Sequence, residues 1–330
     1  MKENNKVIVT GGAGLIGSYI SDYLINSGRD VTVIDNFYRG RKEYLSYYES
    51  VDFIEKDIRD LTCSDVVEGV TQVIHTASKV LGIGYSASNQ VEMMTHNDEI
   101  TNALLSYLDH FPNLKELVII SSSCVYDDNV EDCSDEYPLT GTPELANVGY
   151  GLAKRFLEDK CRLYAKERGL KLIVVRPFNI YGERYTWAGK NSQGLPSLVK
   201  KLLDNKGKLE IWGTGSQRRN YMHASDCARI ICELPKRQTT ESGTYNVGLK
   251  ETISLKELAE RMCALYGLEP EFVYLHDMPQ GRLNKICDET LLRNLYPDYD
   301  DGLVSLDEGL LSMRQWYLKT FVKNKNKNKY

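Results

Sequence analysis

The sequence predicts an α/β protein with a doubly wound parallel sheet and a smaller α/β lobe. Short apolar runs alternate with amphipathic segments over residues 1–182, which is the pattern of parallel strands joined by helices. A glycine-rich turn separates the first apolar run from the first amphipathic segment. From residue 183 the pattern changes to loops, short strands and helices, which we interpret as a lobe on the carboxyl edge of the sheet.

The first predicted strand, 6–10, ends in the glycine-rich turn 11–17. Gly11 permits the tight turn, Gly14 lets the backbone approach a pyrophosphate, and Gly17 lets the helix pack on the strand. The N-terminus of the following helix supplies amides and a dipole to the phosphates. Because a strand precedes the turn, a helix follows it and an acid ends the next strand, the turn predicts a Rossmann dinucleotide site.

Asp35 ends the second predicted strand, 30–34, and indicates which dinucleotide binds. A carboxylate at this position bonds both hydroxyls of the adenosine ribose and repels a 2′-phosphate, which favours NAD over NADP. Arg39 and Arg41 are an alternative signal for NADP, but because they follow the acid we interpret them as loop charge.

Four further strands and two helices continue the alternation. The strands are predicted at 51–55, 72–77, 117–120 and 172–176, and the helices at 96–108 and 150–167. Asp57 and Ile58 are expected beside the adenine, and the small Ala77 lets backbone pass the cofactor. His75 is interpreted as a strand-end histidine satisfied by backbone rather than as a catalytic group. The loop 79–84 follows the fourth strand at the edge where such sheets bind ligands.

Tyr150 and Lys154 are four residues apart on the second of these helices, so they lie on one face. An ammonium close to the phenol favours the phenolate and is expected to lower the tyrosine pKa from about 10 towards working pH. A phenolate beside a nicotinamide takes the proton of a sugar hydroxyl as hydride leaves its carbon. The pair is therefore predicted to be catalytic, although Tyr-x-x-x-Lys also arises by chance in many helices.

The predicted strand 117–120 leads into Ser122 and Cys124. In extended backbone, residues two apart point the same way, so both side chains are expected to face one ligand. Ser122 can hydrogen-bond the reacting oxygen, and Cys124 can act as a base if its thiol pKa falls below the usual value of about 8.5. The alternative for Cys124 is a small buried apolar residue.

The composition is that of an ordinary soluble globular protein, with 42% hydrophobic and 26% charged residues and a net charge of −5. No apolar run approaches the roughly 20 residues of a membrane span, and residues 1–5 lead directly into a strand, so we expect neither a membrane segment nor a signal peptide. The eight cysteines include no Cys-x-x-Cys pair, which argues against a zinc site or a disulfide framework and favours the cytoplasm. The acidic body argues against a nucleic-acid partner, and an anionic ligand would need a few placed arginines.

Residues 1–182 are predicted to form the NAD-binding domain, to which a later segment can return. Residues 183–320 are predicted to be mainly a substrate-binding lobe. Residues 321–330 are expected to form a disordered Lys/Asn tail, which we interpret as a solubilising end rather than a tether. At 330 residues, the chain is long enough for two closely packed domains.

Seven segments in order resemble the extended short-chain dehydrogenase/reductase family, in particular its NAD-dependent nucleotide-sugar epimerase/dehydratase branch. They are TGGAGLIG at 10–17, Asp35, DIR at 57–59, HTAS at 75–78, SSSCVY at 121–126, YGLAK at 150–154 and RPFNIYG at 176–182. The resemblance extends from Lys6 to about Trp316. It implies bound NAD, a nucleotide-diphosphate sugar as substrate, and a catalytic triad of Ser122, Tyr150 and Lys154.

The resemblance also implies which residues contact the ligands, and it implies no metal. For NAD these are Gly11, Gly14, Leu15, Ile16, Gly17, Asp35, Asn36, Asp57, Ile58, Ala77, Lys79, Tyr150, Lys154 and Phe178. For the nucleotide diphosphate and the sugar they are Gly82, Ile83, Asn179, Gln193, Arg219, Arg282 and Lys285.

The loop 79–83 resembles that of GDP-fucose synthases, and 82–85 resembles GDP-mannose 3,5-epimerases. Both have a cysteine at the position of Cys124, where the resemblance implies removal of protons from carbons that flank a transient C4 ketone. Their partner acid precedes a proline where this chain has Gln193, with Lys190 three residues away. Because glutamine is not a useful proton donor, the two-centre route of these relatives lacks its second acid here.

Two related reactions are disfavoured. Dehydratases of this family place an Asp-Glu pair where this chain has Ser123 and Cys124, and decarboxylases also need a nearby glutamate, which we do not find in the sequence. GDP-fucose synthases consume NADPH, whereas Asp35 favours NAD that is retained and regenerated.

The predicted function is therefore that of an NAD-dependent epimerase that inverts C3 and/or C5 of a GDP-sugar through a transient 4-keto intermediate. The alternatives are a C4-epimerase in which Cys124 is inert, a net C4 oxidoreductase, and a non-catalytic NAD-sensing scaffold. Relatives pair through a four-helix bundle, so a homodimer is expected. Leu157, Cys161 and Tyr164 are predicted to form its outer apolar stripe, at helical spacing.

Overall fold

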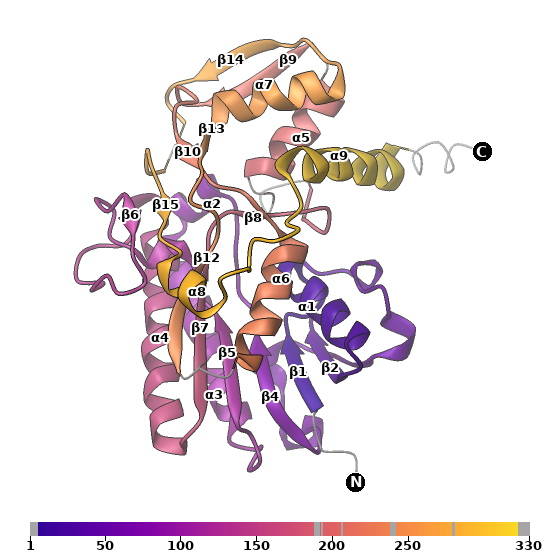
Figure 1. The fold of residues 1–330 in the computed structure, drawn as a ribbon, viewed down its shortest axis with the longest axis vertical. Helices are drawn as coiled ribbons and strands as arrows, with labels where there is room; N and C mark the ends of the chain where they lie inside the picture. Colours follow the sequence, from indigo (N-terminus) through magenta and orange to yellow (C-terminus); the bar gives the residue numbers. More distant parts are fainter. Residues whose placement is uncertain are drawn as a thin grey trace.

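The central element of the fold is a seven-stranded sheet in the order β12-β7-β5-β4-β1-β2-β3, in which every neighbouring pair is parallel. The computed structural model describes residues 6–187, 192, 194–205, 207–237, 242–278 and 281–322 (Figure 1). The strands are β1 Lys6–Thr10, β2 Asp30–Asp35, β3 Asp52–Glu55, β4 Val70–His75, β5 Glu116–Ile120, β7 Lys171–Pro177 and β12 Gly243–Val247. The strand order changes direction between β1 and β4, and such a switch point opens a crevice at the carboxyl ends of the strands. The prediction of a Rossmann sheet is confirmed.

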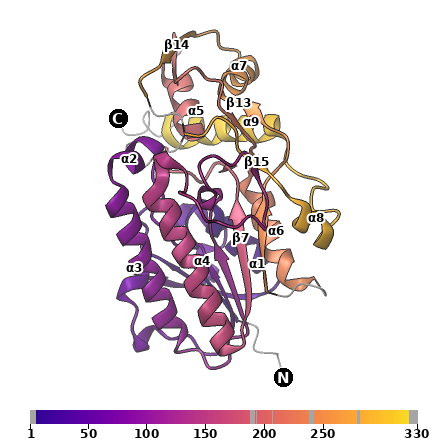
Figure 2. The same ribbon diagram turned by 90° about the vertical axis from the view of Figure 1, so that its left-hand side faces the viewer.

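Two pairs of helices cover the sheet. α1 Leu15–Asn26 packs with α6 Ala224–Glu233 on one face. α3 Gln90–Leu108 packs with α4 Val148–Arg168 on the other, where Figure 2 shows the two running side by side. α3 begins at Gln90 rather than at the predicted His96, so this helix pair reaches up to the carboxyl edge of the sheet.

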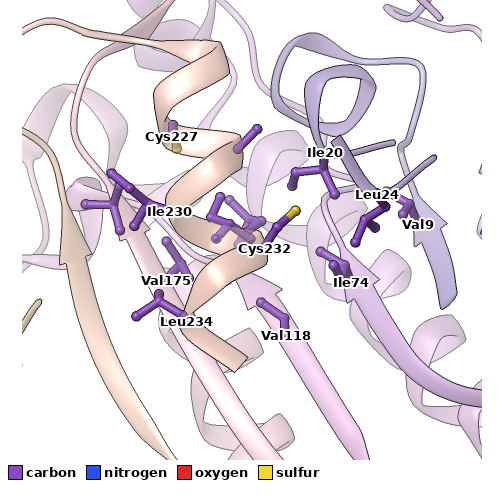
Figure 3. Packing of buried hydrophobic residues seen from close by; sticks show 14 of the residues in the cluster. Val9, Ile20, Leu24, Ile74, Val118, Val175, Cys227, Ile230, Cys232 and Leu234 are labelled. Carbon is purple, nitrogen blue, oxygen red and sulfur yellow. The ribbon is translucent and has the colours of Figure 1, made fainter. Parts of the chain in front are cut away.

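Strand residues alternate between two buried clusters, as the period of a β-strand requires. Ile20 and Leu24 of α1 and Ile230 of α6 lie on the same side as Val9 and Ile74, and Figure 3 shows their packing. The opposite cluster joins the intervening strand residues to α3 and α4. Burial on both faces explains why these strands are continuous apolar runs.

The exposed face of α4 differs from the prediction. Leu157, Cys161 and Tyr164 belong to the core beneath the helix and are at most 9% exposed, so the predicted outer stripe is wrong. Phe156 and Leu163 point outward instead, with exposed fractions of 37% and 63%. The spacing was helical, but a helix on a sheet buries its more continuous apolar face, and that face is turned to the sheet.

A lobe lies over the carboxyl ends of the strands, at the top of Figure 1. It contains α5 Gly194–Asp204, β9 Lys208–Trp212, α7 Leu255–Tyr266, β14 Glu271–Leu275 and α9 Leu306–Tyr317. Its own core includes Leu198, Leu202, Leu209, Ile211, Leu258, Met262 and Met313. β12, α6 and α8 Thr290–Leu295 return from this part of the sequence to the sheet.

The remaining helix and strands are short and connect the two parts. They are α2 Ile83–Ser88, β6 Asp132–Cys133, β8 Ile180–Tyr181, β10 Arg218–Arg219, β11 Met222–His223, β13 Ile253–Ser254 and β15 Ile286–Cys287. Lys190, Gln193 and the tail from Lys323 onward lie outside the described residues. Among the residues that are described, no helix combines the length and the apolar character needed to cross a membrane.

Candidate active site

A cavity of about 1120 Å³ lies between the carboxyl edge of the sheet and the lobe. Most of the predicted ligand contacts line it: Gly11, Gly14, Leu15, Ile16, Gly17, Asp35, Asn36, Asp57, Ile58, Ala77, Lys79, Gly82, Ile83, Ser122, Cys124, Tyr150, Lys154, Asn179, Arg219 and Lys285. Residues from nine separate stretches of the sequence thus meet in one place.

Two of the predicted contacts, Phe178 and Arg282, do not line the cavity. Phe178 is fully buried behind it, in a cluster with Val125. The Arg282 guanidinium donates hydrogen bonds from Nη1 to the carbonyl oxygens of Asp127 (3.0 Å) and Val130 (2.6 Å). Arg282 therefore braces the loop after β5, and its contact with substrate stays a prediction.

The glycine turn forms a floor without side chains. Gly11 has a φ of +69°, and a Cβ added there would lie 2.6 Å from the backbone nitrogen of Ala77. A Cβ at Gly17 would collide with the carbonyl oxygen of Gly11. The turn after β1 and the end of β4 therefore touch backbone to backbone, and the N-terminus of α1 opens into the cavity above them.

Asp35 sits at the end of β2 with its carboxylate held by backbone. Its Oδ2 accepts a hydrogen bond from the Ala13 N–H (2.9 Å) and its Oδ1 accepts one from the Phe37 N–H (2.8 Å). Burial raises the pKa of this carboxyl, and the two N–H donors act in the opposite sense. Each oxygen keeps further acceptor capacity for a ribose hydroxyl.

Asp57 lies just after β3, the strand next to β2, at the same end of the cavity as Asp35. Its carboxylate accepts from Asn36 Nδ2 (2.8 Å) and forms an ion pair with Arg59 (2.9 Å). The hydrogen bond from Arg59 lowers the pKa of Asp57 to about 2. Asp57 is thus an anion whose orientation is set before any ligand binds.

Arg39 differs from its interpretation as loop charge. Its side chain lines the cavity, its Nε is buried without a hydrogen-bond partner, and burial lowers its pKa. Tyr150 and Tyr185 are among the groups that its charge acts on. The backbone turns at Phe37, which has a φ of 55°, and the chain then carries Arg39 over the cavity.

His75 is buried at the end of β4 and does not line the cavity. Its Nδ1 lies 2.8 Å from the Thr10 hydroxyl, and burial lowers its pKa to about 3. It is a neutral structural histidine, although its partner is a side chain rather than the expected backbone.

Tyr150 and Lys154 both line the cavity and are 8% and 3% exposed. Lys154 Nζ lies 5.7 Å from the centre of the Tyr150 ring and donates to the Ile120 carbonyl (2.8 Å). Burial raises the pKa of Tyr150, while hydrogen bonds with Ser122 and Ser78 lower it. Burial also lowers the pKa of Lys154 to about 8. The predicted fall of the tyrosine pKa is therefore wrong for this structure, because loss of water opposes a charge on either group.

Ser122 and Cys124 reach the cavity by a turn rather than by an extended strand. Ser123–Val125 is a 3₁₀ turn, and the Ser122 hydroxyl accepts a hydrogen bond from the Cys124 N–H (3.1 Å). The expectation of extended backbone is wrong, yet both side chains line the cavity. Local capping by serine at the strand end explains the turn.

A carboxylate that the sequence analysis missed, Glu144, touches the Cys124 thiol. Cys124 Sγ donates to Glu144 Oε2 at 3.4 Å, and Lys285 Nζ donates to the same oxygen at 2.9 Å. Lys285 Nζ is also 3.8 Å from Cys124 Sγ. Glu144 is therefore a glutamate near the predicted site, where the sequence analysis had found none for a decarboxylase reaction. No local pattern marks it, since Glu144 is a single acid in the loop before α4.

The charges in this group of three residues are buried. Glu144 is 3% and Lys285 4% exposed. Burial would raise the pKa of Glu144, but the charges of Lys285 and Arg219 hold it well below its usual range. Burial raises the pKa of Cys124, Lys285 lowers it and Glu144 raises it further.

The lobe side of the cavity contains polar groups that could form hydrogen bonds with a ligand. Asn179 has a φ of 41°, and its Nδ2 is buried with no hydrogen-bond partner. Arg219 donates from Nη1 to the Arg218 carbonyl (2.7 Å) and also lines the cavity. An unsatisfied amide beside a guanidinium suits a phosphate or a sugar hydroxyl.

The far end of the cavity carries an aromatic ring and an ion pair that the sequence analysis did not single out. Trp212 lines the cavity and its ring lies next to Gly84. Glu210, two residues earlier on β9, pairs with Lys201 at 2.8 Å. The strand period places Glu210 and Trp212 on one face, which indicates a platform with a carboxylate beside it.

A sequence profile of the NAD dependent epimerase/dehydratase family matches residues 7–248. The chain belongs to this family. Within the described parts of the chain, no group of three or more histidine, cysteine, aspartate or glutamate side chains could hold a metal ion.

Individual relatives cover nearly the whole chain. The GDP-L-colitose synthase of Yersinia pseudotuberculosis is 28% identical over 323 residues, which is 95% of this chain and 98% of that protein. GDP-mannose 3,5-epimerase 1 of Oryza sativa subsp. japonica is 28% identical over 298 residues, 88% of this chain and 76% of that protein. The structure of UDP-glucuronic acid 4-epimerase from Bacillus cereus, in complex with UDP-glucuronic acid and NAD, superimposes with a TM-score of 0.84 at 25% identity, covering 96% of this chain and 100% of that one.

NAD is the cofactor of this epimerase/dehydratase family, and the cavity fits it. Gly11 and Gly17 leave a floor that a pyrophosphate can approach, and the buried Arg39 Nε provides an unpartnered donor for that anion. Asp35 offers a buried carboxylate at the ribose position, which would repel a 2′-phosphate. These residues match NAD more closely than NADP.

Proposed function

We propose that this protein is an NAD-dependent epimerase that inverts C3 and/or C5 of a GDP-sugar through a transient 4-keto sugar. The observation that carries the proposal is the Cys124 thiol, which lines the same cavity as Tyr150 and Lys154. A C4-epimerase needs no such group, because its 4-keto sugar only has to rotate in the site before the hydride returns to C4. Relatives that are named for GDP-sugars support the GDP part of the proposal.

Each polar group of the site has a proposed task. Bound NAD would take the C4 hydride and return it. Tyr150 accepts the proton of the C4 hydroxyl, and Ser122 donates a hydrogen bond to the same oxygen. Burial raises the pKa of Tyr150 and lowers that of Lys154, so the proposed step requires that the positive charge of bound NAD favour the tyrosinate, with Lys154 on the same face of the helix. The ketone acidifies the neighbouring C–H bonds. Inversion of such a carbon needs proton removal on one face and proton return on the other, so Cys124 would carry one of these two protons, and water or another residue would carry the other.

The lobe, residues 183–320, is proposed to bind the nucleotide diphosphate. Arg219 of the lobe, together with Asn179 from the end of the sheet domain, supplies donors for the phosphates and the sugar. The Trp212 indole offers a face on which a base can stack. Glu210 is suited to guanine, because its carboxylate can accept from N1–H and from the 2-amino group, a donor pair that uracil lacks.

We further propose a cytoplasmic homodimer that interacts with neither nucleic acid nor membrane. All eight cysteines lie in the described part of the chain and are free, which supports a reducing compartment. Val91 on α3 and Phe156 and Leu163 on α4 are exposed apolar side chains of the helix pair. Two such pairs would form a four-helix interface. A monomeric mass by light scattering at micromolar concentration, or no drop in mass on Leu163→Glu, would contradict it.

The function is tested by turnover in deuterated water with GDP-, UDP-, CDP- and dTDP-sugars. We expect the protein to purify with NAD, and a GDP-sugar to gain deuterium at C3 or C5 at a rate that falls by about 10²–10⁴ in Cys124→Ser. NAD content by acid extraction serves as the control, since the substitution should leave it unchanged.

Other outcomes would identify the alternatives. Turnover without deuterium incorporation, at the same rate in the unchanged protein and in Cys124→Ser, would establish the C4-epimerase. The solved Bacillus cereus structure is that of a C4-epimerase. A stoichiometric change in the cofactor's redox state would indicate a net C4 oxidoreductase. NAD binding with no turnover of any sugar in the panel would favour the non-catalytic scaffold, and recovery of mainly NADP would overturn the interpretation of Asp35.

A further inference from the structure

The group formed by Cys124, Glu144 and Lys285 contains one more charged residue than proton transfer at carbon requires. If Lys285 alone faced the sulfur, its ammonium at 3.8 Å would stabilise a thiolate. Glu144 lies between them: its Oε2 is 2.9 Å from Lys285 Nζ and 3.4 Å from Cys124 Sγ. One carboxylate oxygen thus neutralises the lysine and accepts the hydrogen of the thiol.

Burial makes this arrangement selective between charge states. A thiolate beside the Glu144 carboxylate would put two anions 3.4 Å apart, and Glu144 is only 3% exposed, so water screens its charge poorly. A neutral thiol leaves one anion and one cation in contact. The pKa directions agree with this comparison, since Glu144 raises the pKa of Cys124 and Lys285 lowers it.

We propose that Glu144 is a positioning residue for Cys124, whose carboxylate orients the S–H bond and cancels the charge of Lys285, so that the sulfur faces the cavity as a thiol. The value of this arrangement for the reaction rests on the proposed function. The protonation state of Cys124 does not, and it can be measured without turnover.

Two other titratable groups interact with the sulfur and must be accounted for. Tyr150 and Lys154 on α4 both have electrostatic interactions with Cys124. Neither has a hydrogen bond to the sulfur among the described contacts, whereas Glu144 and Lys285 do. A substitution at Glu144 therefore tests the contact that is shortest.

The test is the pH dependence of alkylation of Cys124 by iodoacetamide in the full-length protein, followed by mass spectrometry of the peptide that contains it. Cys124→Ser identifies the background from the other cysteines. In Glu144→Gln the ammonium of Lys285 is left to pair with the sulfur, so the midpoint should fall by at least about one pH unit, a tenfold gain in thiolate at neutral pH. Glu144→Asp, which keeps the charge, should restore a midpoint close to that of the unchanged protein.

Glu210→Gln is the matched control, because Glu210 is also a cavity carboxylate paired with a lysine but does not touch Cys124. Its midpoint should not move. An unchanged or raised midpoint in Glu144→Gln would overturn the proposal. If circular dichroism shows that Glu144→Gln does not fold, Lys285→Met decides: a raised midpoint supports the proposal, and an unchanged or lowered one overturns it.

Discussion

The cofactor end and the sugar end of the cavity are built in different ways. At the cofactor end, backbone does most of the binding: the turn at Gly11 is bare, and Asp35 is already held by two N–H groups. At the sugar end, side chains from distant loops meet, as in the contact of Glu144 with Lys285. Several buried polar atoms there have no partner, among them Asn179 Nδ2 and Gln217 Oε1.

The two ends thus differ in how much of their geometry backbone contacts set before ligand binds, although Arg39 Nε, assigned to the cofactor end, also lacks a partner. A buried polar atom without a partner costs roughly 1–3 kcal/mol, and a ligand that supplies the missing hydrogen bond removes that cost. The cofactor end therefore presents its backbone shape to the dinucleotide largely preformed. The sugar end discriminates, because only a ligand with matching donors and acceptors satisfies its open groups. Four predictions break or sharpen this comparison, from the largest effect to the smallest.

Tyr150→Phe removes the group where the two ends meet. Turnover should fall by about 10²–10⁴, because Tyr150 is the proposed acceptor of the hydroxyl proton and phenylalanine cannot accept it. The amount of bound NAD should not change. Acid extraction measures the NAD, and single-turnover kinetics measures the rate. Tyr107→Phe is the matched control, since Tyr107 is a buried tyrosine remote from the cavity whose hydroxyl bonds the Asp65 carbonyl (2.8 Å). Equal losses in both variants would show a defect of folding instead.

Gly11→Ala tests the backbone floor of the cofactor end. It should lower the free energy of unfolding by roughly 2–4 kcal/mol, since the added carbon would lie 2.6 Å from the Ala77 nitrogen at a φ of +69°. Gly28→Ala has a similar φ of +75° but nothing within 4 Å of the added carbon, so it should cost only about 1 kcal/mol. Urea unfolding measures both. Similar losses would mean that strain, and not close approach, requires the glycine.

Asp135 lies behind the sugar end and carries a raised carboxyl pKa. Burial raises this pKa to about 7, although a hydrogen bond from the Asn246 N–H acts to lower it. Asp135 Oδ2 has no hydrogen-bond partner. The folded state therefore holds a proton that the unfolded state has lost above its usual pKa of about 3.9. Stability should be greatest at low pH within this window and fall by roughly 3 kcal/mol as pH rises from 4 to 7, then level off.

The measurement is urea unfolding across that range, with Asp135→Asn and Asp132→Asn compared. Asp132 is exposed, so its substitution should leave the slope unchanged, whereas Asp135→Asn should flatten it. A slope that persists in Asp135→Asn would assign the effect to another group.

Asp35→Asn is the smallest change, because it removes charge and leaves the shape of the cofactor end. NAD affinity should fall about tenfold and the preference over NADP should narrow, since the carboxylate no longer bonds the ribose as an anion or repels a 2′-phosphate. Fluorescence titration with both dinucleotides measures this. The alkylation midpoint of Cys124 should not change, and a shift would show that the two ends are not independent.

The fold and the cofactor end followed from the sequence because their signals are local. Apolar runs with the period of a strand identified six strands of the sheet, and the spacing of Gly11, Gly14 and Gly17 identified the turn. Asp35 completed the pattern within the next strand. Each of these features depends on residues close together in the chain, so its geometry is set by backbone conformation and short-range packing.

The sugar end was decided by the tertiary structure. Glu144 and Lys285 are 141 positions apart, and no pattern within either segment predicts that they meet at Cys124. The same holds for the side of α4 that is buried, because Leu157 and Leu163 have similar apolar character and only the position of the sheet chooses between them. The tyrosine pKa also depended on packing, since spacing brings Lys154 onto the face of Tyr150 but burial determines whether either group can be charged. Sequence sets which groups a helix or a strand carries, whereas solvent exclusion and contacts between distant loops set what those groups can do.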